Sequence, residues 1–139
     1  MITTPSKLVL FACVHNAGRS QMAAAFFNAL TSPTVVRGVS AGTQPGERVH
    51  PEVVTVMQEL GMDLSNVKPQ RLTPELAATV DLLVTMGCGE ACPFVPGLRR
   101  IDWALPDPKG QPLDRVRDIR DEIRDHVMGL IHDNAWSAD

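Results

Sequence analysis

The chain has 139 residues, a length that fits one domain, which we place at residues 1–139. Its formal net charge is −3 with acidic and basic residues interspersed, which excludes the extended basic surface that binds nucleic acid or an anionic membrane. The longest apolar run, residues 8–14, is too short to span a membrane and does not resemble a secretory signal, so we expect a cytoplasmic protein. We also expect a monomer.

The first half of the chain alternates strand-like and helix-like segments. Residues 7–13, KLVLFAC, form an apolar run typical of a buried strand, and residues 21–30 place apolar side chains at helical spacing. Residues 34–40 predict a second strand. Residues 51–60 predict a helix that Pro51 opens and Gly61 ends.

The second half continues this alternation. We expect a short helix beginning near Thr73, a strand over residues 80–86, an irregular stretch over 87–97 and a brief strand over 99–102. Residues 113–131 predict a closing amphipathic helix. The fold class is therefore α/β, with a parallel sheet of about four strands and helices on both faces.

The charged run RDIRDEIRDH within the closing helix is expected to be a solvated face. Pairs such as Arg117 and Asp121, four residues apart, would add only about 0.3–0.5 kcal/mol each to helix stability. We assign this run no functional site.

The segment CVHNAGRS lies between the first predicted strand and the first predicted helix, where open α/β sheets bind ligands. A Cys-x5-Arg loop can direct successive backbone N–H groups at a tetrahedral oxyanion, and its arginine can hold two oxygens. The positive charge of these groups also favours a thiolate on Cys13. The alternative is that Cys13 is a buried core cysteine that precedes an ordinary helix cap. The predicted oxyanion-binding loop consists of Cys13, Val14, His15, Asn16, Ala17, Gly18, Arg19 and Ser20.

Three residues of this loop have expected structural roles. Ser20 can donate a hydrogen bond to the Cys13 sulfur. Asn16 and Gly18 suit backbone positions with positive φ, which a tight ring of amides requires.

Together with Asp107-Pro108 in a late loop, CVHNAGRS resembles the low-molecular-weight protein tyrosine phosphatases, and the resemblance covers nearly the whole chain. It implies that Cys13 attacks the substrate, that Arg19 holds the oxyanion and that Asp107 protonates the leaving group. On spacing alone, Asp107 would be an ordinary turn residue, because Asp-Pro pairs are frequent in turns.

Two features favour a reductase of this fold over a phosphatase. The chain has no tyrosine, and Lys109 and Gly110 follow the Asp-Pro pair, so the aromatic wall that binds a substrate ring in the phosphatases is missing. In MGCGEACP, Cys88 and Cys92 resemble the additional cysteines of thioredoxin-coupled arsenate reductases, as do the segments SQMA and SAGT.

This second resemblance implies a thiol relay. Cys13 attacks arsenate, Cys88 attacks Cys13 and releases arsenite, and Cys92 attacks Cys88 to leave a Cys88–Cys92 disulfide. Arsenate is then the substrate, with phosphate and sulfate as analogues. Thioredoxin or another thiol system, such as glutaredoxin, is the external reductant, and no cofactor is bound. The Cys-x3-Cys spacing permits a disulfide, since residues one helical turn apart have Cα atoms about 6 Å apart.

Other interpretations remain open at this point. Cys88 and Cys92 could be buried thiols without a role, and the chain could be a tyrosine phosphatase or a non-enzymatic oxyanion- or arsenic-binding thiol protein.

We expect no metal site. The histidines lack ligand spacing for zinc, and His15 is expected to face solvent. Some members of the family bind potassium through acidic residues, but the matching positions here carry Ala24 and Gln70. The histidines are His15, His50, His126 and His132.

Overall fold

Four parallel strands form one sheet in the spatial order β2-β1-β3-β4 in the computed structural model, which describes residues 7–87 and 95–138. Strand β1 pairs with β2 and with β3, and β3 pairs with the edge strand β4. The expected α/β class and four-stranded parallel sheet are therefore confirmed. The strands are β1 (Lys7–Cys13), β2 (Val36–Gly42), β3 (Leu82–Thr85) and β4 (Arg99–Asp102).

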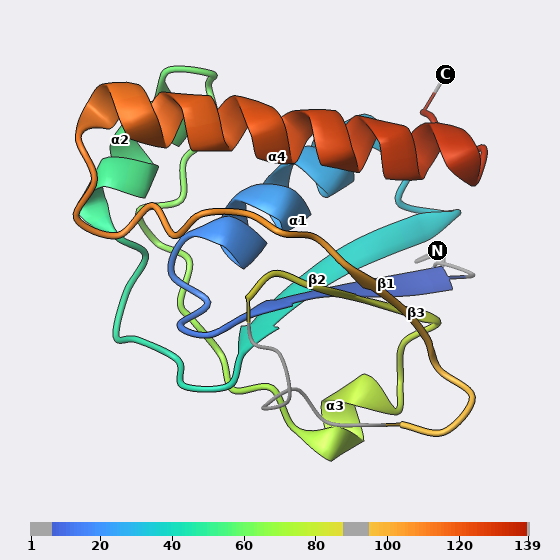
Figure 1. The fold of residues 1–139 in the computed structure, drawn as a ribbon. Helices are drawn as coiled ribbons and strands as arrows, with labels where there is room; N and C mark the ends of the chain where they lie inside the picture. The colour runs from blue at the N-terminus through green and yellow to red at the C-terminus, as the bar shows by residue number, and fades with distance from the viewer. Residues whose placement is uncertain (1–6, 88–94, 139) are drawn as a thin grey trace.

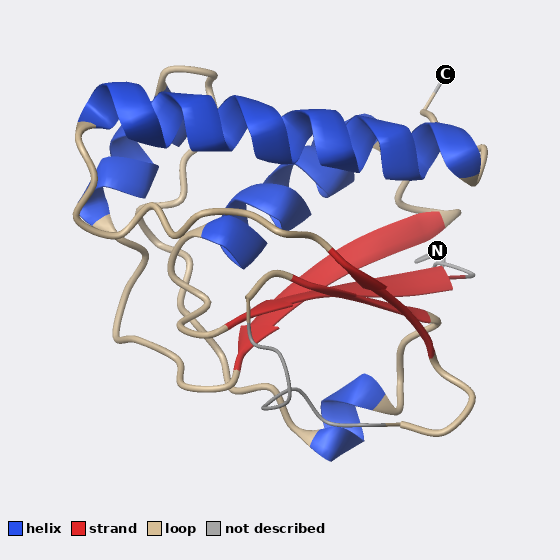
Figure 2. Ribbon diagram, viewed as in Figure 1, coloured by secondary structure: helices blue, strands red, loops and turns tan. Residues whose placement is uncertain are grey.

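Helices cover the two faces of the sheet unequally (Figures 1 and 2). Helices α1 (Arg19–Leu30), α2 (Pro51–Gln58) and α4 (Leu113–Asp133) lie on one face, and the single turn of α3 (Pro74–Ala77) lies on the other. Helices on both faces were expected. The larger apolar core, with Phe11, Phe26 and Ile119, lies under the three helices, while a smaller cluster around Leu10 and Leu83 lies on the α3 face.

The second strand begins and ends two residues later than its sequence pattern predicts. It includes Ala41 and Gly42, residues with low strand propensity, because it pairs with β1 as far as Cys13. A Cβ atom at Gly42 would lie 2.6 Å from the Val14 carbonyl oxygen, so only glycine leaves room for the chain that follows β1. Strand pairing and close packing thus override local propensity beside the predicted site.

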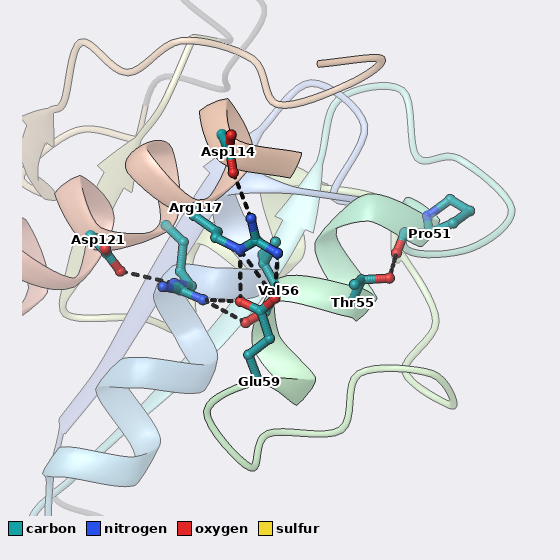
Figure 3. Close-up of polar contacts among 8 residues, drawn as sticks. Pro51, Thr55, Val56, Glu59, Asp114, Arg117 and Asp121 are labelled. Carbon is teal, nitrogen blue, oxygen red and sulfur yellow. Dashed lines mark hydrogen bonds and ion pairs between the residues drawn. The ribbon is translucent and has the colours of Figure 1, made fainter. Parts of the chain in front are cut away.

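The charged face of α4 is partly occupied by contacts with α2 (Figure 3). Glu59, the residue after α2, accepts hydrogen bonds from Arg117 at 2.8–3.1 Å and from Arg120 at 2.9 Å. Arg117 also pairs with Asp114, and Arg120 pairs with Asp121. The predicted Arg117–Asp121 pair is therefore wrong, because the long Arg117 side chain reaches across to the end of α2.

Helix α4 is the longest helix in the described parts of the chain. Charged residues are frequent along its 21 residues. Neither α4 nor any other helix in residues 7–87 and 95–138 has the combination of length and apolar sequence that crossing a bilayer requires.

Candidate active site

The loop at residues 13–20 joins the carboxyl end of β1 to the first turn of α1. Within this fully described loop, Asn16 is the residue with left-handed backbone, at φ 51°. The prediction of positive φ for Gly18 is wrong, since its φ is −143°. The glycine is required there by space, because a Cβ atom at Gly18 would lie 2.8 Å from Pro108 Cγ.

The carbonyl groups of the loop are directed outward and are hydrogen-bonded to the segment that follows β2. The oxygens of Cys13, Val14, His15 and Ala17 accept from the N–H groups of Thr43, Gln44, Gly46 and His50 at 2.7–3.2 Å. In the described parts of the chain, the N–H groups of residues 14–18 have no acceptor. A ring of unpartnered backbone donors at a helix N-terminus is an anion-binding arrangement.

Asn16 holds the loop in this shape from a fully buried position. Its Nδ2 donates to Ser20 Oγ at 2.7 Å, and its Oδ1 accepts from Gln21 Nε2 at 3.1 Å and from the Gln70 backbone N–H at 2.9 Å. The roles of Gln21 and Gln70 were not found from the sequence, because nothing in its local pattern shows which residues meet Asn16 after folding.

The Cys13 thiol is buried and lies 2.8 Å from Ser20 Oγ. The Ser20 oxygen already accepts from Asn16 Nδ2, so its own hydrogen is free to point at the sulfur. A hydroxyl that donates to the sulfur can stabilise negative charge on it during nucleophilic attack.

Arg19 connects the loop to the segment that contains Asp107. Its side chain is buried, and Nη1 donates to the Leu105 carbonyl oxygen at 3.1 Å. The Arg19 Nη2 atom lies 3.9 Å from Asp107 Oδ2, too far for a hydrogen bond but close enough for attraction between the charges. The Asp107 side chain is 46% exposed, and its Oδ1 accepts from the Lys109 N–H at 3.0 Å.

The fold thus places Cys13, Arg19 and Asp107 at one end of the sheet, although Asp107 follows Arg19 by 88 positions in the sequence. The other two predicted site residues, Cys88 and Cys92, lie outside the described residues.

A histidine of the loop, His15, lies near a second histidine, His50. His15 is half-buried rather than fully in solvent, and its ring is 6.4 Å from that of His50 in an edge-to-face orientation. Burial lowers the pKa of His50 from its ordinary value, because it disfavours the charged imidazolium. Lys109 and Gly110, which follow the predicted acid, are exposed. Nothing in the local sequence around His50 predicts that it lies near His15.

The residues expected near a potassium ion do not fit one. Ala24 has no side-chain oxygen, and the Gln70 side chain donates Nε2 to the Ser40 carbonyl oxygen at 2.8 Å. Asn16 Oδ1 already accepts two hydrogen bonds. Within residues 7–87 and 95–138, no group of three or more His, Cys, Asp or Glu side chains could hold a metal ion.

Comparison with known proteins identifies relatives over most of the chain. Residues 8–135 match the family described as low molecular weight phosphotyrosine protein phosphatase. A protein of Halobacterium salinarum named putative arsenate reductase is 40% identical over 124 residues, which cover 86% of this chain and 87% of that protein. A glutaredoxin arsenate reductase of Synechocystis is 33% identical, with 90% and 96% of the two chains covered.

A solved structure has the same fold and similar sequence. The thioredoxin-dependent arsenate reductase of Corynebacterium glutamicum superposes with a TM-score of 0.80 at 36% identity. The match covers 95% of this chain and 63% of the Corynebacterium chain, so the present chain corresponds to less than two thirds of that protein.

Proposed function

The chain belongs to the low-molecular-weight phosphotyrosine protein phosphatase family, and within that family we propose that it is an arsenate reductase that uses thiols as its source of electrons. The observation that carries this proposal is the run of backbone N–H groups at residues 14–18, which have no acceptor within the described residues and directly follow the buried Cys13 thiol. Such a run of donors fits a tetrahedral oxyanion and places it directly at a nucleophile. The relatives named arsenate reductases support arsenate as that oxyanion.

The first step forms a covalent bond between sulfur and arsenic. The Cys13 thiolate, stabilised by the Ser20 hydroxyl, attacks arsenate held by the loop amides and by Arg19. One arsenate oxygen leaves as water after Asp107 gives it a proton. Arg19 must release the Leu105 carbonyl, or share its N–H groups with it, to hold two arsenate oxygens.

The second step supplies the electrons. The Cys88 thiolate attacks the Cys13 sulfur, so an S–S bond forms, the S–As bond breaks and its electron pair remains on arsenic. Arsenic(V) is thereby reduced to arsenic(III), and two thiols are oxidised to one disulfide. Cys92 then attacks Cys88, releases the Cys13 thiolate and leaves a Cys88–Cys92 disulfide.

Thioredoxin is the reductant that we propose for this disulfide. Thioredoxin dependence is stated for the Corynebacterium relative, whereas the Synechocystis relative is a glutaredoxin enzyme. The two donors can be distinguished directly, because each can be supplied with its own NADPH-dependent reductase system.

A coupled assay tests the proposal. Purified protein with arsenate, thioredoxin and thioredoxin reductase should oxidise NADPH, and the Cys13→Ser variant should not, although its loop should still bind sulfate. Replacement of thioredoxin by glutathione and glutaredoxin gives the comparison for the donor. Failure of wild type to oxidise NADPH with either donor, together with rapid hydrolysis of an aryl phosphate, would contradict the proposal and favour a phosphatase.

A further inference from the structure

Gly87 lies against the guanidinium group of Arg19. A Cβ atom at position 87 would lie 2.5 Å from Arg19 Nη1, 3.3 Å from Cζ and 3.4 Å from Nη2. All three distances are shorter than an ordinary contact of about 3.5–4.0 Å between heavy atoms. The guanidinium therefore occupies the space in which the Cβ atom of any other residue at position 87 would lie.

The positive φ of Gly87 does not by itself explain this close approach. Gly61, Gly97 and Gly110 also have φ values of 71–80°, but a Cβ atom at any of them would meet nothing within 4 Å. Gly87 thus combines the left-handed backbone of the other glycines with a specific contact to a residue of the candidate active site.

We propose that Gly87 is a positioning residue for Arg19, and this proposal rests on the oxyanion role proposed above for that arginine. Gly87 follows β3 closely, and Leu105 follows β4, so the guanidinium is held between the ends of two neighbouring strands. The absence of a side chain at position 87 lets Arg19 reach the Leu105 carbonyl and stay beside the loop.

An alanine at position 87 would force the guanidinium to move by about 1 Å to restore normal contact. The arginine has a long, flexible side chain, so it can move without unfolding the protein. A displacement of this size is enough to weaken interactions with a bound oxyanion by roughly 10- to 100-fold.

The rates at which two alkylating agents modify Cys13 can be compared to test the position of Arg19, and this test needs no arsenate. Iodoacetate carries a carboxylate that Arg19 can hold, whereas iodoacetamide is uncharged. The ratio of their alkylation rates at Cys13 therefore depends on whether the Arg19 guanidinium is placed to bind the carboxylate. The measurement uses the full chain with Cys88→Ser and Cys92→Ser, so that Cys13 is the one cysteine left. Gly61→Ala is the matched control, because it imposes the same backbone cost at a φ of 79° with no contact.

We expect Gly87→Ala to lower the ratio of iodoacetate to iodoacetamide rates by about 10-fold, and Gly61→Ala to leave it unchanged. In an Arg19→Ala background, Gly87→Ala should have no further effect on this ratio. A purely structural role would instead lower it in both backgrounds. If Arg19→Ala does not fold, Arg19→Lys, which lacks the planar fork of arginine, takes its place in this double-mutant cycle.

Two results would overturn the proposal, and they differ from each other. If Arg19→Ala lowers the ratio but Gly87→Ala behaves as Gly61→Ala does, Arg19 keeps its oxyanion role and Gly87 does not position it. If wild type shows no preference for iodoacetate and Arg19→Ala changes nothing, the oxyanion role itself fails, and both proposals fail with it.

Discussion

Replacement of Ser20 by alanine removes the hydroxyl that lies 2.8 Å from the Cys13 sulfur. The same oxygen accepts a hydrogen bond from Asn16 Nδ2 at 2.7 Å, so the substitution breaks two hydrogen bonds at once. Both Ser20 and Asn16 are fully buried. The variant should therefore lose both reactivity of the thiol and stability of the fold.

The two losses have different sizes. A hydrogen bond to a charged group contributes about 1.5–3 kcal/mol, which is roughly a 10- to 100-fold factor in the stability of a negatively charged sulfur. A sulfur without this hydrogen bond is intrinsically more nucleophilic, which recovers about half of this loss on a logarithmic scale. We expect alkylation of Cys13 to slow by about 3- to 10-fold, and the unpartnered Asn16 amide to cost about 1–3 kcal/mol of unfolding free energy.

Alkylation with iodoacetamide at pH 6, where an ordinary thiol is almost fully protonated, measures the first effect, and urea unfolding measures the second. Ser40→Ala is the control, since Ser40 lies in β2 opposite Phe11 of β1, and within the described residues its hydrogen bond to Gln70 uses the backbone carbonyl and not the hydroxyl. Equal alkylation rates in wild type and Ser20→Ala would refute the view that this hydroxyl stabilises the thiolate.

Further predictions concern the loop, the acid and the contact between α2 and α4. Asn16→Ala should be less stable than Asn16→Gly by about 1–2 kcal/mol in urea unfolding, because alanine is strained at φ 51° and both variants lose the same side-chain hydrogen bonds. Asp107→Asn should slow formation of the arsenic adduct by about 10²–10⁴-fold in a single-turnover experiment while sulfate binding persists; an unchanged rate would exclude it as the acid. Hydrogen bonds from Arg117 and Arg120 lower the pKa of Glu59 below its ordinary 4.5, so this contact stabilises the fold fully above that pH and is lost as the pH falls through the lower, folded value. Glu59→Gln should accordingly have a lower Tm than wild type at pH 7, and the difference should shrink below pH 4.5; a constant difference would show that the charge is not responsible.

The sequence predicted the site better where chemistry constrains residue type than where packing does. A thiol, an arginine and a serine around a short loop after an apolar run locate the anion site, because few arrangements need those groups at that spacing. Gly18 shows the limit of such reasoning. The sequence pattern attributes the glycine at position 18 to a positive φ. In the structure a glycine is needed there because Pro108, which is distant in sequence, leaves no room for a Cβ atom.

Contacts between distant segments account for the other differences. Gln70 holds Asn16, and Gly87 meets Arg19, but no local pattern pairs these residues. The shift of β2 likewise follows from its register with β1 rather than from propensity. The roles of Cys88 and Cys92 stay predictions from resemblance, because both lie outside the described residues.

The fate of the three thiols after a single turnover tests the central claim most directly. One equivalent of arsenate, given to the reduced protein without any external reductant, should yield one equivalent of arsenite and a Cys88–Cys92 disulfide in peptide mapping. The Cys92→Ser variant should release the same arsenite but stop as a Cys13–Cys88 disulfide, and Cys88→Ser should release almost none. Sustained turnover by a variant with both Cys88→Ser and Cys92→Ser, supplied with thioredoxin and its reductase, would contradict the relay and show that Cys13 alone is sufficient.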